Sequence, residues 1–128
     1  MSNYIILFIS LSVFLHSCGP RSLEDCRDQA ERVSRNLLYD LEKIETKDDL
    51  TRAIPKLRGH YTQLADLLID AHSLKEGEIT VYSPSHSLNE DLRKELVRVY
   101  SIDGGRELME KAQREGLHRL NLYAPEMK

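Results

Sequence analysis

Residues 50–71 read LTRAIPKLRGHYTQLADLLIDA, and this stretch carries the strongest periodic signal in the chain. Its apolar residues recur in alternating steps of four and three, at Leu50, Ile54, Leu57, Tyr61, Leu64, Leu68 and Ala71. Such spacing places one apolar stripe along a helix. Pro55 falls inside the run, but the stripe keeps its phase across it, so we predict a kink and not a break. The alternative is a short turn up to Arg52 and a new helix from Pro55.

A second apolar stripe precedes this one, with members at Leu23, Cys26, Ala30, Val33, Leu37, Leu41 and Ile44. Asp40 occupies the position where a strict heptad would place an apolar residue, and Leu41 replaces it. Each stripe follows a helix-start signature, Ser22 with Asp25 in the first case and Thr46 with Asp49 in the second. The pattern predicts two long helices joined by a tight turn.

The C-terminal part is predicted to form a third helical element broken in two. Residues 87–90 (Ser-Leu-Asn-Glu) have capping-box spacing, and residues 103–105 (Asp-Gly-Gly) interrupt the apolar pattern that follows. Gly116 faces the resumed stripe, where it either allows close helix approach or ends the helix. We favour a continuous helix because partners for a strand are scarce. Residues 75–86 lack a helical period and are expected to form an irregular connection.

The expected fold is therefore all-α, an antiparallel bundle of three to four helices over residues 22–124. The chain has 18 basic and 21 acidic side chains and a formal net charge of −3, a balance that argues against nucleic-acid binding. It has no Trp, and both Phe lie in the first 17 residues, so the core must consist mainly of Leu, Ile, Val and Ala. A helical unit of this size is marginal alone, so a protein partner or self-association is expected.

The first 17 residues contain no charged side chain, and residues 5–15 read IILFISLSVFL. This length is typical of the apolar region of a secretory signal, whereas a membrane-spanning helix needs about 20 residues. The segment ends in Leu15-His16-Ser17-Cys18. This motif resembles the lipobox of bacterial lipoproteins, in which an aliphatic residue stands three positions before a cysteine and a small residue directly before it. His16 departs from the family's usual small residue, and residues 1–3 lack Lys and Arg.

The resemblance implies a signal peptide at residues 1–17, a diacylglycerol on the Cys18 thiol and a lipidated tether at residues 18–21. The lipid bilayer would then be a partner through acylated Cys18, and the chain would be a lipid-anchored protein of the cell envelope. Gly19 follows the cysteine where enteric-type retention needs Asp, which favours the outer membrane if the source has one. The alternatives are an uncleaved anchor or a signal peptide cut nearby by another peptidase.

The remaining chain shows no pattern of catalytic, cofactor-binding or metal-ligating residues. Its histidines have no metal-ligand spacing and there is no Cys-x-x-Cys pair. Asp66 and Asp70 share a helix face opposite the apolar stripe and are predicted to form a solvated acidic surface. Ser83 to His86 lacks the elbow of a serine hydrolase, so we expect that the protein is not an enzyme. Cys26 is expected to be a core residue, with an intermolecular disulfide as the alternative.

These features favour a membrane-anchored exported lipoprotein that acts as a protein-interaction or structural helical module of the cell envelope. The alternative is a small-ligand or cell-wall-binding lipoprotein with a pocket between the helices and residues 75–86. Tyr82, His86 and Tyr123 would be candidates to line that pocket.

Replacing Cys18 tests the anchor. Cys18→Ala removes the only thiol at the predicted cleavage site, so labelled fatty acid should no longer be incorporated and a larger, unprocessed precursor should accumulate. Metabolic labelling and gel mobility measure both effects. Processing and membrane attachment like those of the parent would contradict the lipoprotein interpretation.

Overall fold

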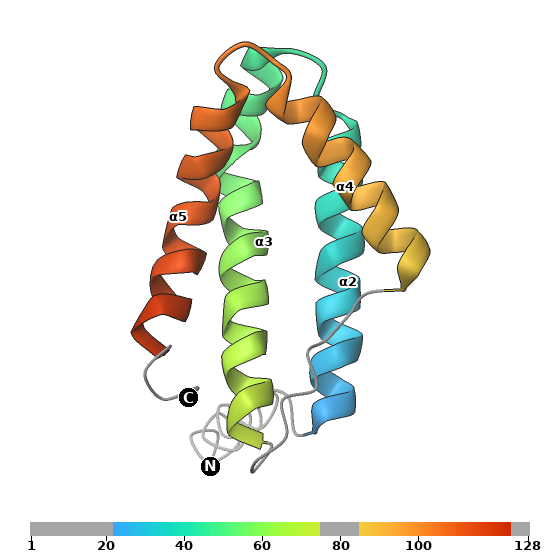
Figure 1. The fold of residues 1–128 in the computed structure, drawn as a ribbon, viewed down its shortest axis with the longest axis vertical. Coiled ribbons are helices and arrows are strands. Elements are labelled where there is room, and N and C mark those ends of the chain that lie inside the picture. The colour runs from blue at the N-terminus through green and yellow to red at the C-terminus, as the bar shows by residue number, and fades with distance from the viewer. Residues whose placement is uncertain (1–21, 75–84, 124–128) are drawn as a thin grey trace, which may run out of the picture.

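The computed structural model describes residues 22–74 and 85–123, which form the helices α2 (Leu23–Glu42), α3 (Lys47–Leu74), α4 (His86–Tyr100) and α5 (Gly105–Tyr123). Within these two ranges there is no strand. Helices α2 and α4 run toward the end of the molecule that carries both interhelical turns, and α3 and α5 run away from it (Figure 1). The predicted all-α antiparallel bundle is confirmed. The leader, Cys18 and most of the 75–86 connection lie outside the described residues.

Helix α2 buries the stripe expected from its sequence, with Cys26, Ala30, Val33, Leu37 and Leu41 in the core. The hydroxyl of Ser22 accepts the backbone N–H of Asp25 at 3.1 Å, as the start signature predicts. Ile44 is also buried although the helix ends at Glu42, so the stripe extends into the turn.

Helix α3 is a single helix of 28 residues with Pro55 inside it, so the prediction of no break is confirmed. Pro55 has no N–H, which leaves the carbonyl of Thr51 without its helical donor. Both residues are exposed, so water can satisfy that carbonyl. The Thr51 hydroxyl donates to the Lys47 carbonyl at 2.9 Å.

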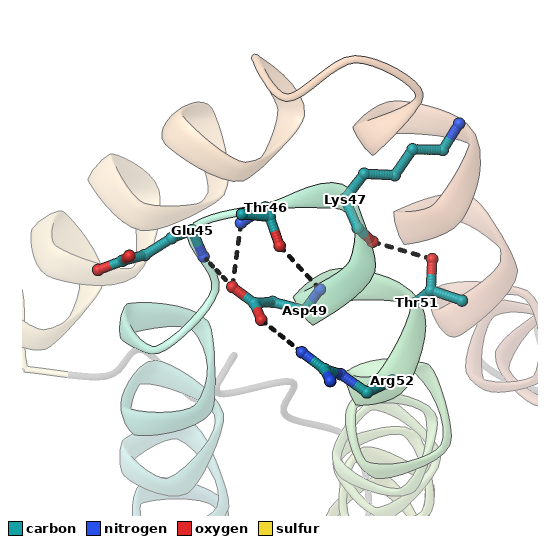
Figure 2. Close-up of polar contacts among 6 residues, drawn as sticks. All are labelled: Glu45, Thr46, Lys47, Asp49, Thr51 and Arg52. Carbon is teal, nitrogen blue, oxygen red and sulfur yellow. Dashed lines mark hydrogen bonds and ion pairs between the residues drawn. The ribbon is translucent and has the colours of Figure 1, made fainter.

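The start of α3 is held by a reciprocal cap (Figure 2). The backbone N–H of Asp49 donates to Thr46 Oγ1, and the backbone N–H groups of Glu45 and Thr46 donate to Asp49 Oδ2, each at 3.1 Å. Arg52 donates to Asp49 Oδ1 at 2.8 Å. The two backbone donors, followed by Arg52, lower the pKa of the Asp49 carboxyl because they favour its charged form. The capping signature at residues 46–49 is confirmed.

Helix α4 does not begin as predicted. It starts at His86, after Ser85, whose side chain makes no capping hydrogen bond. Glu90, expected to reach back to Ser87, instead accepts from Arg93 at 3.1 Å. The capping box at residues 87–90 is therefore wrong, because its acidic member is engaged one turn further along the helix.

Two glycine positions behave as the sequence indicates. Residues 101–104 separate α4 from α5, and Gly104 there has a φ of 74°, a left-handed conformation that suits glycine. Gly116 lies inside α5, and a Cβ at this position would be 2.9 Å from the carbonyl oxygen of Tyr61 on α3. The helix continues through Gly116, and the predicted close approach of two helices is confirmed.

The stripe along α3 is covered over only part of its length. Leu50 and Leu68 are 18 residues apart, which is about five turns of an α-helix, so they point in the same direction. Leu50 is fully buried, whereas Leu68 is 38% exposed. Next to it, Leu67 is only 5% exposed and packs with Ala30 and Val33 of α2. The expectation that Leu68 belongs to the core is therefore wrong, although its helical phase is right.

The adjacent leucines make a matched test of this arrangement. Leu67→Ala should lower the free energy of unfolding by about 2–5 kcal/mol, because it removes a buried side chain from the α2–α3 contact. Leu68→Ala should cost about 1 kcal/mol or less, since its side chain is partly solvated already. Urea unfolding followed by circular dichroism measures both. Equal losses, or the larger loss at Leu68, would contradict the structure.

The cap of α3 predicts a pH dependence. The pKa of Asp49 is lower in the folded protein than the value of about 3.9 expected when unfolded, so its ionised form stabilises the fold above that pH. This contribution is lost as the pH falls through the lowered folded-state pKa. The melting temperature of Asp49→Asn should therefore be lower than that of the parent at neutral pH, and this difference in melting temperature, here called the gap, should become smaller in acid. Thermal melts across the pH range measure the gap.

The control for this measurement is Asp48→Asn. It removes the same charge at the neighbouring position, but Asp48 accepts none of the capping hydrogen bonds. A gap for Asp49→Asn that is independent of pH, or that is matched by Asp48→Asn, would show that the cap does not act through its charge.

Candidate functional site

Two open grooves follow the contact between α3 and α5, one on each side. The first, here called the apolar groove, has a volume of about 350 Å³ and is lined almost wholly by apolar atoms. Its lining residues are Tyr61, Leu64, Ala65 and Leu68 from α3 and Gln113, Gly116, Leu117 and Leu120 from α5. Because Gly116 has no side chain, the two helices meet closely along this line.

The apolar groove is the uncovered part of the bundle core. Helices α2 and α5 both pack on α3, while α4 packs mainly on α2. Figure 1 shows α4 close to the other helices at the end with the turns and directed away beyond α2 at its N-terminal end. No described helix therefore covers the side of α3 that carries Leu68. Leu117 of α5, which is 56% exposed, lines the same groove.

A buried phenol lies in the wall of the apolar groove. The hydroxyl of Tyr61 is shielded from solvent and has no hydrogen-bond partner among the described residues. Burial raises the pKa of this phenol because it disfavours the phenolate. The neighbouring Gln113 amide donates to the hydroxyl of Tyr100 at 3.1 Å.

The second groove, here called the polar groove, lies on the other side of the α3–α5 contact and has a volume of about 880 Å³. Arg58 on α3 and Lys111 and Arg114 on α5 line it, and none of these side chains pairs with a carboxylate of the described residues. Arg119 also lines it and does form ion pairs, described next. The groove therefore carries an excess of positive charge on a chain whose formal net charge is −3.

An ion pair links the two helices at the end of the polar groove. Arg119 Nη1 lies 2.7 Å from Asp66 Oδ2, and Arg119 Nε lies 3.3 Å from Glu115 Oε1. The two carboxylates, Asp66 first, raise the pKa of the Arg119 guanidinium. Asp66 is about half exposed, as expected for a solvated surface, but α5 supplies it with a cationic partner that the α3 sequence alone did not indicate. Asp70 is exposed as expected.

A second polar contact joins α2 to α3. Asp40 is buried, and its Oδ2 lies 2.6 Å from Nε2 of His60. Lys56 Nζ lies 3.6 Å from the other carboxylate oxygen. This explains the polar residue found at an apolar position of the first stripe. The pattern marked Asp40 as anomalous, but nothing in it indicated His60, which is 20 residues away.

Cys26 is a buried free thiol, as the core interpretation predicts. Burial, with smaller contributions from the carboxylates of Asp70 and Asp25, raises the pKa of this thiol. Since the thiolate is the reactive form, these surroundings disfavour disulfide exchange at Cys26.

The residues suggested for a ligand pocket are not brought together where the structure describes them. Tyr82 lies outside the described residues. His86 is the first residue of α4 and Tyr123 the last of α5, and both are exposed. Figure 1 shows these helix ends on opposite sides of the bundle. Tyr123 instead lines a third groove with Ile69, Asp70 and Leu122.

Comparison with known proteins gives no relative: no family model, curated protein or solved structure matches the chain. None of the helices in the described ranges combines the length and apolar character needed to cross a membrane. Among the same residues, no group of three His, Cys, Asp or Glu side chains is placed to hold a metal ion.

Proposed function

We propose that this chain is an exported lipoprotein, anchored through acylated Cys18, whose helical bundle acts as a protein-interaction module of the cell envelope. The motif Leu15-His16-Ser17-Cys18 supports the anchor. Gly19 after the cysteine supports an outer-membrane location where the source has one. The proposed role is binding and assembly, without catalysis.

The observation that carries the interaction role is the uncovered side of α3. Leu68 lies in line with the core residue Leu50 but faces the apolar groove and not a fourth helix. Partly solvated leucines gain free energy when a partner covers them, by about 25 cal/mol for each Å² of apolar surface removed from water. The bundle therefore offers a partner the same kind of contact that holds its own helices together.

The occupant that this groove fits is an amphipathic helix of another protein chain. Apolar side chains of α3 and α5 form the two walls of the groove, which is the arrangement that accepts the apolar face of a third helix. At this level of α3, the other flank is closed by the contact of Leu67 with Ala30 and Val33 of α2. A helix between α2 and α5 would complete the four-helix arrangement that α4 completes only near the turns.

A second candidate function, binding of a small ligand or of the cell wall, is favoured by the polar groove. Arg58, Lys111 and Arg114 line it without carboxylate partners, so they are available to an anionic group. These side chains are exposed, and hydrated surface charges bind individual anions weakly. The apolar groove therefore carries the leading proposal.

Site-specific crosslinking in the native membrane tests the interaction. A photoreactive amino acid at Leu68 of the full chain should form a protein adduct, because this side chain lines the apolar groove. Leu117→Glu should remove most of that adduct, since it places a charge in the opposite wall. Immunoblotting for the chain measures the adduct, and an adduct of twice the monomer mass identifies the partner as a second copy.

Val97→Glu is the matched control. Val97 is 55% exposed and Leu117 is 56% exposed, but Val97 lies on α4, away from the groove, so its variant should keep the adduct. Both variants should retain the parent's melting temperature within a few degrees, since exposed substitutions change stability by about 0.5 kcal/mol or less. An adduct that survives Leu117→Glu, or no protein adduct at all, would overturn the interaction proposal. A small molecule that co-purifies and raises the melting temperature would favour the second candidate.

A further inference from the structure

Exposed apolar side chains lie at the C-terminal ends of α3 and α5. Leu74 is the last residue of α3, and Leu122 and Tyr123 are the last two of α5; all three are exposed, Leu122 to 66%. Figure 1 shows that α3 and α5 end on the same side of the molecule, opposite the two interhelical turns. We call Leu74, Leu122 and Tyr123 the tip patch.

The chain's route to its proposed anchor starts from the same end. Helix α2 begins at Leu23, and Figure 1 places this start at the same end of the molecule as the ends of α3 and α5. Cys18 precedes Ser22 by four residues, and four extended residues span at most about 14 Å. If Cys18 carries the lipid, the start of α2 lies no further than that from the membrane surface.

We propose that this end of the bundle rests on the lipid bilayer, with the tip patch inserted into its interfacial region. The inference rests on the proposed anchor at Cys18, and adds to it an orientation and a second contact. Leucine side chains gain by leaving water for the acyl boundary, and tyrosine is enriched at membrane interfaces, where its ring is apolar and its hydroxyl stays hydrated. The chemistry of the three residues therefore fits a lipid surface.

The charged side chains near the tip patch carry no net positive charge, so the proposed contact with lipid would rest mainly on its apolar side chains. The third groove, which Leu122 and Tyr123 line, also contains Asp66, Asp70 and Arg119, so it has no excess of positive charge. The first turn of α2 carries Glu24 and Asp25. Anionic lipids should therefore not strengthen the contact, in contrast to a polybasic membrane-binding segment.

Among the described residues, the other large exposed apolar side chains outside the apolar groove are Val97 on α4 and Tyr39 on α2, and they form no second patch of this kind. Val97 lies in the last turn of α4, at the end with the interhelical turns. The ring of Tyr39 lies under the Lys43 ammonium, whose nitrogen is 3.8 Å from the ring centroid. The bundle thus has one end suited to lipid.

This orientation sets the distance of the turns from the membrane. Helix α3 has 28 residues and is therefore about 42 Å long. With the tip patch at the bilayer, the turns lie roughly that far from the surface along the direction of the membrane normal. The apolar groove, which follows α3, then extends away from the membrane and is open to the surrounding compartment along its length.

A single tryptophan tests the contact, because the chain has none of its own. Leu122→Trp is introduced into the full, lipidated chain, which is reconstituted into phosphatidylcholine vesicles with and without brominated acyl chains. We expect a blue-shifted emission that loses most of its intensity in the brominated vesicles, to the same extent when anionic lipid is added. Tyr123→Trp is a second reporter in the same patch. Val97→Trp, at the opposite end, should show neither effect.

The outcomes distinguish a failure of the proposed orientation from a failure of the proposed lipid anchor. Flotation of the chain with vesicles and fatty acid on Cys18, together with a Leu122→Trp emission that is not quenched, would overturn the orientation and leave the anchor standing. A blue shift without bromine quenching would mean that protein covers the patch, and would also overturn it. If no fatty acid is found on Cys18, the proposed anchor fails and the inference fails with it.

Discussion

An arginine of α4 joins the two helical hairpins through carbonyl groups at the end of α2. The last carbonyls of a helix have no partner in its regular hydrogen-bond ladder. The Leu41 carbonyl accepts the backbone N–H of Ile44 at 3.1 Å, and Arg98 adds a second donor from another helix. Arg98 of α4 donates through Nη2 to the Leu41 carbonyl at 2.8 Å and through Nη1 to that of Ile44. Its Nε binds Glu95 on the same helix at 2.7 Å. One guanidinium therefore holds the C-terminal end of α4 against the end of α2, beside the fully buried Val99.

That constraint explains why the bundle is closed at one end and open at the other. The largest fully buried side chains belong to the turns and the adjoining parts of the helices: Leu41, Ile44, Leu50, Leu57, Val99 and Met109. Because α4 is held there and then diverges beyond α2, the core thins along α3 until Leu68 is exposed. The largest fully buried side chains therefore lie toward the turns, whereas the apolar groove and the tip patch remain exposed.

Most local features were predictable from the sequence, apart from the start of α4, and the long-range contacts were not. Helical period and capping residues act within a few positions, so the two long helices, the cap at residues 46–49 and the break before α5 could be predicted. Nothing in the sequence around Arg98 distinguishes it from an ordinary surface arginine, because the two backbone carbonyls that it binds lie 54 and 57 residues away. The exposure of Leu68 depends on where α4 diverges, which no periodicity encodes. Nor does the spacing of α3 predict the pairing of Asp66 with Arg119, which comes from α5.

The two proposed contacts restrict each other through the direction of α3. A tip patch on the bilayer orients α3 and α5 away from the membrane, and the apolar groove follows their contact line. A helix that fills this groove must then also stand away from the membrane. An amphipathic helix that lies flat on the same bilayer would be perpendicular to the groove and could contact only the end of the groove nearest the membrane. Taken together, the two proposals favour partners whose binding helix projects from the membrane or comes from the adjoining compartment over peripheral helices that lie on the lipid surface.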